Sequence, residues 1–161
     1  QERIDAAGLM RELHEEYEMI DADHEYVCPI PEDAAPLYVV GDVTMLKQAL
    51  RVLLDNAGKY TPKKGTITLQ AQRDGSEIRC SVADNGVGIP SDDLPRIFDR
   101  FFQVDSSTTR IYGGRGLGLA LVREYAAAQG YTVGVESELG CGSAFTVRIP
   151  VKAVVELDED E

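Results

Sequence analysis

Residues 42–58 carry the feature that most constrains the fold, an amphipathic helical pattern with a clear start and a clear end. Asp42 is suited to cap the first turn, and Thr61-Pro62 ends the run because proline cannot continue a helix. Apolar residues recur every three or four positions, so they form one stripe along the helix. The stripe consists of Leu46, Ala49, Leu50, Leu53, Leu54 and Ala57.

Strand-like alternation follows this helix. Apolar and polar residues alternate over 66–72 and again over 78–82, and residues 74–76 form an Asp-Gly-Ser turn between the two runs. Alternation of this kind places one set of side chains on a buried face. The two runs therefore predict an antiparallel hairpin with one buried face.

Two further helices and two closing strands are expected elsewhere in the chain. The helices are predicted over Arg3–Ile20 and Gly116–Ala128, and the strands over Val133–Ser137 and Ala144–Ile149. The helices at 42–58 and 116–128 would cover one face of a mixed sheet. The predicted fold class is α/β, a two-layer α/β sandwich.

The net charge of −12 is concentrated at the two ends of the 161-residue chain. Residues 1–25 hold nine acidic and two basic side chains, and residues 151–161 hold five acidic side chains and one lysine. We therefore expect an acidic N-terminal helix at 1–25, docked on the domain or continuing from an upstream helical domain. One domain at 26–150 and an acidic tail at 151–161 follow. The acidic balance disfavours nucleic acid as a partner, since phosphate backbones require a basic face.

The lengths of the apolar runs and the positions of the cysteines favour one cellular compartment. No apolar run approaches the 18 residues expected of a membrane-spanning helix. Cys28, Cys80 and Cys141 are far apart and have no metal-ligand spacing, so reduced thiols are expected. We expect a cytoplasmic domain without direct membrane contact, and membrane anchoring of a parent protein stays open.

Asn56, Lys59 and Tyr60 share one face near the end of the predicted helix 42–58, because they stand at positions i, i+3 and i+4. The amide oxygen of Asn56 suits Mg²⁺, which takes oxygen ligands and phosphates. Lys59 offers a point charge for a phosphate group, and Tyr60 offers an apolar ring with a polar tip. A solvated helix end is the alternative explanation.

Asp84 stands at the end of a predicted strand, and Gly86 and Gly88 follow it. Glycines there permit a sharp turn and close approach of a ligand to the backbone. A carboxylate at this place could accept a hydrogen bond from the exocyclic amine of adenine, which guanine lacks at that position. A plain Asp-Asn-Gly turn is the alternative.

Two more motifs surround a long irregular stretch. Residues 113–119, Gly-Gly-Arg-Gly-Leu-Gly-Leu, open a helix, and exposed N–H groups at a helix start attract anions. The motif lacks the Gly-Lys-Ser/Thr of a Walker-type loop. Residues 97–102, Ile-Phe-Asp-Arg-Phe-Phe, place aromatic rings and Arg100 before the stretch. Buried anchors for a hinge, with a solvated arginine, are the alternative here.

Taken in order, these motifs resemble the catalytic, ATP-binding domain of sensor histidine kinases, in the GHKL ATPase superfamily. Residues 56–61 (Asn-Ala-Gly-Lys-Tyr-Thr) resemble its N box, and residues 84–90 (Asp-Asn-Gly-Val-Gly-Ile-Pro) its first glycine box. Residues 97–102 resemble the F box, and residues 114–119 the second glycine box. The resemblance covers about residues 37–150, and residues 102–112 are similar to the ATP lid of hybrid-type kinases.

The resemblance implies a role for each matching position. Asn56 would ligate Mg²⁺, Lys59 would contact phosphate and Tyr60 would lie beside the adenine. Asp84 would bind the adenine amine, supported by Ser143, which stands where the family usually has threonine. The remaining implied ligand-binding positions are Gly86, Gly88 and Ile89 on the adenine wall, Arg100 near the terminal phosphate, Phe98 and Phe101 as lid anchors, and Gly114, Arg115, Gly116, Leu117 and Gly118 along the triphosphate.

Two positions depart from the family pattern. Val52 stands where a polar residue is common, and where hydrolytic relatives such as gyrase place a glutamate as general base. Valine cannot accept a proton, so an ATP-hydrolysing motor or clamp is disfavoured. Arg115 stands where a small residue is usual, and it could either contact phosphate or point outward.

The resemblance implies an enzyme, a protein-histidine kinase catalytic domain that uses ATP and Mg²⁺. The γ-phosphate would go to a histidine on a separate dimerisation domain of the same parent protein, with a response regulator further along. His14 and His24 are expected to be ordinary surface histidines, not acceptors. Two other functions stay open, an anti-sigma-type serine kinase and a degenerate nucleotide sensor that acts through protein contacts.

Overall fold

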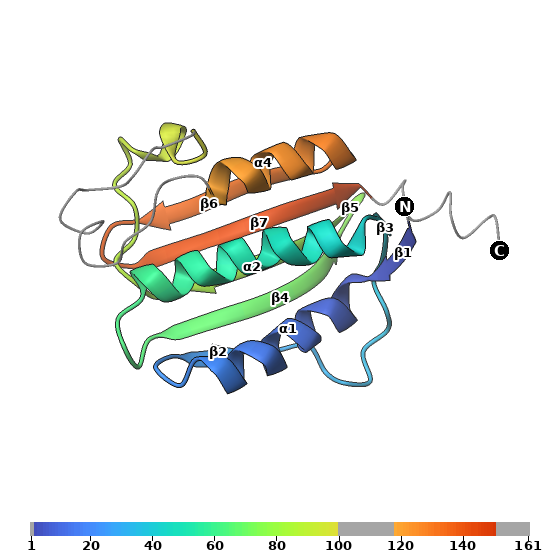
Figure 1. The fold of residues 1–161 in the computed structure, drawn as a ribbon, viewed down its shortest axis with the longest axis horizontal. Helices are drawn as coiled ribbons and strands as arrows, with labels where there is room; N and C mark the ends of the chain where they lie inside the picture. Colours follow the sequence, from blue (N-terminus) through green and yellow to red (C-terminus); the bar gives the residue numbers. More distant parts are fainter. Residues whose placement is uncertain (1, 100–117, 151–161) are drawn as a thin grey trace.

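A mixed sheet carries three helices on one face in the computed structural model, which describes residues 2–99 and 118–150 (Figure 1). The elements in chain order are β1 (Glu2–Asp5), α1 (Ala6–Ile20), β2 (Glu25–Val27), β3 (Tyr38–Gly41), α2 (Val43–Tyr60), β4 (Thr66–Asp74), β5 (Glu77–Asp84), the 3₁₀ turn η1 (Leu94–Arg96), α4 (Gly118–Gln129), β6 (Thr132–Glu138) and β7 (Gly142–Pro150).

The main sheet has the strand order β2-β4-β5-β7-β6. β2 runs parallel to β4, and the other neighbouring pairs are antiparallel. The helices α1, α2 and α4 lie side by side over one face of it, and within residues 2–99 and 118–150 no helix lies over the other face (Figure 1). The prediction of a two-layer α/β sandwich with a mixed sheet is confirmed.

α2 forms where the apolar stripe predicted it. Oδ1 of Asp42 accepts a hydrogen bond from the backbone N–H of Met45 at 3.1 Å, which satisfies one of the otherwise unpaired donors of the first turn. The buried residues of α2 are Leu46, Ala49, Leu50, Leu53, Leu54 and Ala57, the six of the predicted stripe. Because this stripe packs against the sheet, only the remaining faces of α2 can contact a ligand.

The predicted first helix, Arg3–Ile20, is wrong at its beginning. Residues 2–5 form β1, which pairs antiparallel with β3, and α1 begins only at Ala6. The side chain of Asp5 accepts a hydrogen bond from the N–H of Leu37 at 3.1 Å, and Ala6 N–H donates to the Leu37 carbonyl at 2.7 Å. These pairings with a distant segment satisfy the backbone outside the helix.

α1 packs against β4 and beside α2. Its buried residues include Met10, Leu13 and Tyr17, and the Tyr17 hydroxyl donates to Asp55 of α2 at 2.9 Å. No helix within residues 2–99 and 118–150 is both long and apolar enough to cross a membrane.

Candidate functional site

A row of polar side chains lies at one end of the sheet, on the face that packs against the helices. Asp84 of β5 is the register partner of Ser143 in β7, and Ser143 is in turn the partner of Ser137 in β6. The corresponding row two residues further into the sheet is apolar, with Val82 beside Phe145. Since side chains alternate along strands, both rows face the helices. The polar row therefore lies at the edge of the core, between the sheet and the helix layer.

The Asp84 carboxylate is held as a hydrogen-bond acceptor. Its Oδ1 accepts from the N–H of Gly86 at 2.9 Å, and the backbone of Ser143 and the side chain of Thr61 lie close to it. Burial raises the pKa of Asp84, while the N–H of Gly86 and the neighbouring polar groups of Ser143 and Thr61 partly offset the effect. Thr61 is 2% exposed, and its Oγ1 lies beside this carboxylate without a partner of hydrogen-bond geometry. A buried oxygen without a partner beside a fixed acceptor suits a ligand with polar edges.

Residues 84–90 form a loop whose backbone contacts two other parts of the domain. The N–H of Val87 donates to the carbonyl of Tyr60, the last residue of α2, at 3.1 Å. The N–H of Gly140, in the β6–β7 turn, donates to the Val87 carbonyl at 2.8 Å. Gly88 has a φ of 75°, and a Cβ there would overlap the carbonyl of Glu138. Glycine is needed at this position because the loop lies directly on the turn.

The end of α2 carries the predicted metal and phosphate residues. Asn56 is partly buried, Lys59 is exposed and Tyr60 is partly buried, and burial raises the pKa of the Tyr60 hydroxyl. Val52 lies one turn before Asn56 on α2 and contacts the start of α4, since a Cβ added to Gly118 would lie 2.8 Å from Val52 Cγ1. The face of α2 that bears Asn56 and the first residue of α4 are therefore neighbours.

The other predicted positions divide into two groups. Ile89 and Phe98 are partly buried against the core, and the Phe98 ring meets Phe145 edge to face with centroids 6.1 Å apart. The predicted positions Arg100, Phe101, Gly114, Arg115, Gly116 and Leu117 lie outside the described residues. Ser137 was not among the predicted residues, although its hydroxyl accepts a hydrogen bond from Ile89 N–H at 2.8 Å.

The prediction that His24 is a surface residue is wrong. The His24 side chain is 8% exposed, with Nδ1 2.6 Å from Asp21 Oδ2 and Nε2 2.7 Å from the Thr61 carbonyl. His14 is partly buried, with Nε2 2.9 Å from the Tyr26 carbonyl. Both partners of His24 accept hydrogen bonds, so both ring nitrogens carry protons and the ring is charged. His24 thus fixes the residue that follows α2.

The stability of the domain is expected to depend on the charge of His24. Burial alone lowers its pKa, but the Thr61 carbonyl and the Asp21 carboxylate outweigh burial and raise the pKa above its usual value. The contribution of His24 to the free energy of unfolding is therefore full below about pH 6.5 and disappears as pH rises through the raised value. Denaturant unfolding of wild type and His24→Gln across pH should show a difference that shrinks toward alkaline pH. A difference that stays constant across pH would contradict this role.

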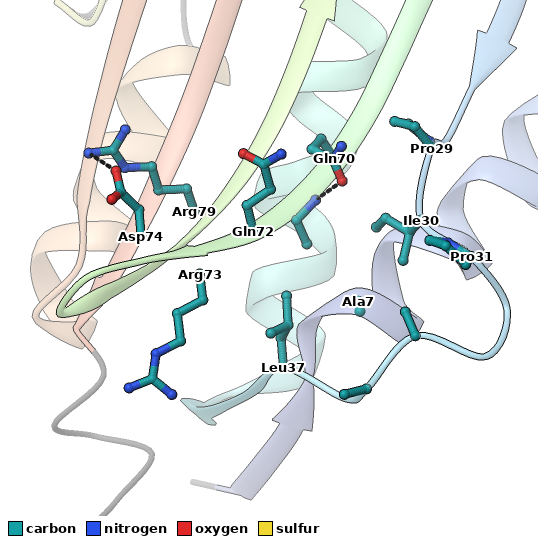
Figure 2. Close-up of a pocket in the computed structure, with 13 residues that line it drawn as sticks. Ala7, Pro29, Ile30, Pro31, Leu37, Gln70, Gln72, Arg73, Asp74 and Arg79 are labelled. Atoms are coloured by element: carbon teal, nitrogen blue, oxygen red, sulfur yellow. Dashed lines mark hydrogen bonds and ion pairs between the residues drawn. The ribbon is translucent and has the colours of Figure 1, made fainter.

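A separate hollow of about 680 Å³ lies at the opposite end of β4 (Figure 2). Ile30 and Leu37 from the connection before β3 line it, together with Gln70 and Gln72 of β4. Ile67, at the start of β4, is the register partner of Asp84, whereas Asp74, at the far end, pairs with Glu77. The length of β4 therefore separates this hollow from the polar row, and none of the predicted site residues lines it.

Comparison with known proteins gives consistent matches. Residues 41–153 match the family described as histidine kinase-, DNA gyrase B-, and HSP90-like ATPase. The sensor-like histidine kinase SenX3 of Mycobacterium tuberculosis (strain ATCC 25618 / H37Rv) is 41% identical over 125 residues, covering 78% of this chain and 30% of SenX3. The chain thus spans less than a third of that relative.

Two solved structures are similar along most of the chain. The mycobacterial sensor histidine kinase MprB has a TM-score of 0.76 at 27% identity, covering 92% of this chain and 96% of that one. Full-length ShkA in complex with AMPPNP has a TM-score of 0.76 at 34% identity, covering 92% of this chain and 30% of that one.

Proposed function

The chain belongs to the histidine kinase-, DNA gyrase B-, and HSP90-like ATPase family, and from that premise we propose that it holds Mg·ATP and directs the γ-phosphate to a histidine on another domain. The matched part corresponds to the ATP-binding catalytic domain of sensor histidine kinases. The observation that carries the proposal is the Asp84 carboxylate, fixed as an acceptor by the N–H of Gly86 at 2.9 Å beside the buried Thr61.

The base would occupy the polar row. Asp84 accepts from the adenine amine, Ser143 supports that contact, and Thr61 Oγ1 gains a partner from the ligand edge. Gly86 and Gly88 let the loop lie directly on Tyr60 and on the β6–β7 turn, because a side chain at either position would overlap those carbonyl groups. The loop contacts to Tyr60 and Gly140 keep this wall in place before the ligand arrives. A preformed wall of this kind lowers the entropy cost of binding.

The phosphates would extend toward Asn56 and the start of α4. A Mg²⁺ ion held there would supply positive charge that neutralises the phosphates. The amide oxygen of Asn56 is a suitable ligand for it, and Lys59 supplies a further positive charge. Val52, on the side of α2 that faces the start of α4, cannot accept a proton from water, so we propose transfer to a presented side chain and not to water. Catalysis then consists of positioning and charge neutralisation.

The acceptor histidine would belong to a helical dimerisation domain of the parent protein, with a response regulator as the later recipient. His14 and His24 do not fit the acceptor role, because each ring is already hydrogen-bonded within the domain. Because ATP is plentiful in the cytoplasm, we propose this compartment for the domain.

Phosphate transfer from γ-labelled ATP tests the proposal. The chain alone should bind Mg·ATP and acquire no acid-labile, base-stable label, whereas addition of the acceptor domain of its own parent should produce labelled acceptor. Omission of Mg²⁺ should abolish the label. Stoichiometric phosphohistidine on the 161-residue chain alone would overturn this division of labour.

A matched pair of variants tests whether Asn56 binds the Mg²⁺ of Mg·ATP. Asn56→Ala should weaken binding of Mg·ATP far more than binding of metal-free ATP, because only the former uses the amide oxygen. Gln48→Ala removes an exposed amide from the same helix and should change neither. Equal losses with and without Mg²⁺ would remove Asn56 from the metal.

A further inference from the structure

The Ser137 hydroxyl has three hydrogen-bond neighbours at the end of the polar row. Its Oγ lies 2.8 Å from the N–H of Ile89, 2.8 Å from the carbonyl oxygen of Gly142 and 2.7 Å from the hydroxyl of Ser143. These neighbours come from the loop 84–90 and from β7. Ser137 therefore joins the loop to the strand that carries Ser143.

The identity of the three neighbours fixes the direction of each hydrogen bond. Ile89 N–H can only donate, and the Gly142 carbonyl can only accept, so Ser137 gives its single proton to Gly142. The second lone pair of Ser137 must then receive the proton of Ser143. The opposite arrangement would leave two oxygens 2.8 Å apart with no proton between them. Ser143 consequently has lone pairs but no proton left for a ligand.

Like Ser143, the Asp84 side chain can only accept hydrogen bonds from a ligand. Its Oδ1 accepts from the N–H of Gly86 at 2.9 Å, and the ionised carboxylate can only accept hydrogen bonds. Asp84 and Ser143 are register partners on one face of the sheet, so their side chains are direct neighbours. The floor of the polar row thus presents two adjacent acceptors and no donor from these side chains.

We propose that Ser137 is a positioning residue that sets base specificity, because it fixes Ser143 as an acceptor beside Asp84. Two adjacent acceptors match the two protons of an amino group, such as that of adenine. They repel a keto oxygen, such as that of guanine. The inference rests on the proposed function, since it assumes that a nucleotide base occupies this row.

Ser137→Ala separates this role from simple support of the loop. Without the Ser137 oxygen, the Ser143 hydroxyl is free to rotate and to donate its proton to a keto group. The preference for Mg·ATP over Mg·GTP should then fall about tenfold, because a site rejects an analogue mainly through polar groups left unpaired. A purely structural loss through Ile89 would weaken both nucleotides by the same factor and leave their ratio unchanged.

Dissociation constants for Mg·ATP and Mg·GTP should be measured by calorimetry for a small set of variants of the 161-residue chain. Ser137→Thr keeps the hydroxyl and should keep the wild-type ratio. Ser143→Ala removes the hydroxyl that Ser137 is proposed to orient. In the double variant Ser137→Ala/Ser143→Ala, the ratio of ATP to GTP affinity should therefore equal that of Ser143→Ala alone. Ser81→Ala, on the uncovered face of β5, is the control and should match wild type.

Each outcome decides between the two proposals. A lowered ratio in Ser137→Ala, restored in Ser137→Thr and absent in the Ser143→Ala background, supports the positioning role. An unchanged ratio in Ser137→Ala overturns it while the proposed function stands. Wild-type protein that binds ATP and GTP equally also overturns it. Wild-type protein that binds neither nucleotide removes the proposed function itself.

Discussion

Asp84→Asn is expected to lower the affinity for ATP by roughly fivefold to 150-fold, the equivalent of about 1–3 kcal/mol for a buried polar group without a partner. The reason lies in the N–H of Gly86, which donates to Asp84 Oδ1 at 2.9 Å. In the variant, the amide oxygen stays with this N–H, so the amide NH₂ is directed at the adenine amine. Two donors then meet, and the preference for ATP over GTP should decrease as well.

Calorimetric titration with Mg·ATP and Mg·GTP at fixed salt measures both effects. Asp33→Asn is a suitable control, because it removes an exposed carboxylate from the connection between β2 and β3. An Asp84→Asn protein with the wild-type ratio of ATP to GTP affinity would rule out this residue as the base-reading group.

Gly142→Ala is expected to cost about 3 kcal/mol of the free energy of unfolding, since backbone strain and a core-edge clash act together. Gly142 has a φ of 121°, a conformation that is nearly restricted to glycine. A Cβ there would overlap the carbonyl oxygen of Asp84 and would lie 2.9 Å from the Cα of Asn85. The start of β7 must then separate from β5, which moves Ser143 away from Asp84 and lowers ATP affinity.

Gly134→Ala is the matched control. Gly134 also lies in this part of the sheet, in β6, yet a Cβ there meets no atom within 4 Å. Its effect should stay within about 0.5 kcal/mol. Denaturant unfolding of both variants measures the difference, and a Gly142→Ala protein as stable as Gly134→Ala would contradict the expected clash.

Local patterns explain which parts of the fold were predictable. The stripe of α2 and the cap at Asp42 depend on spacings within 18 residues, and the structure confirms both. The alternation that predicted β4 and β5 is equally local. β1 was missed because its four residues carry little pattern, and its stability comes from β3, more than thirty residues later.

In the candidate site, too, only residues that stand in local sequence motifs could be predicted. Asp84 and Asn56 stand in recognisable motifs, so the sequence alone identifies them as candidate site residues. Ser137 could not, because a serine between two glutamates predicts only an exposed strand, and its importance arises from Ile89, 48 residues away. His24 likewise lies in a polar, acidic segment, and its burial depends on Thr61, 37 residues later.

These long separations have a consequence for the order in which the domain is completed during synthesis. The floor of the polar row needs β5, β6 and β7 together, because Ser137 and Ser143 join residues near Asp84 only through those pairings. A growing chain that has released α2 and β5 therefore lacks the β6 and β7 part of the polar row until the last strand emerges. A nucleotide bound at this row as proposed would therefore add stability only after the final strand has paired, and would not stabilise the helices formed earlier.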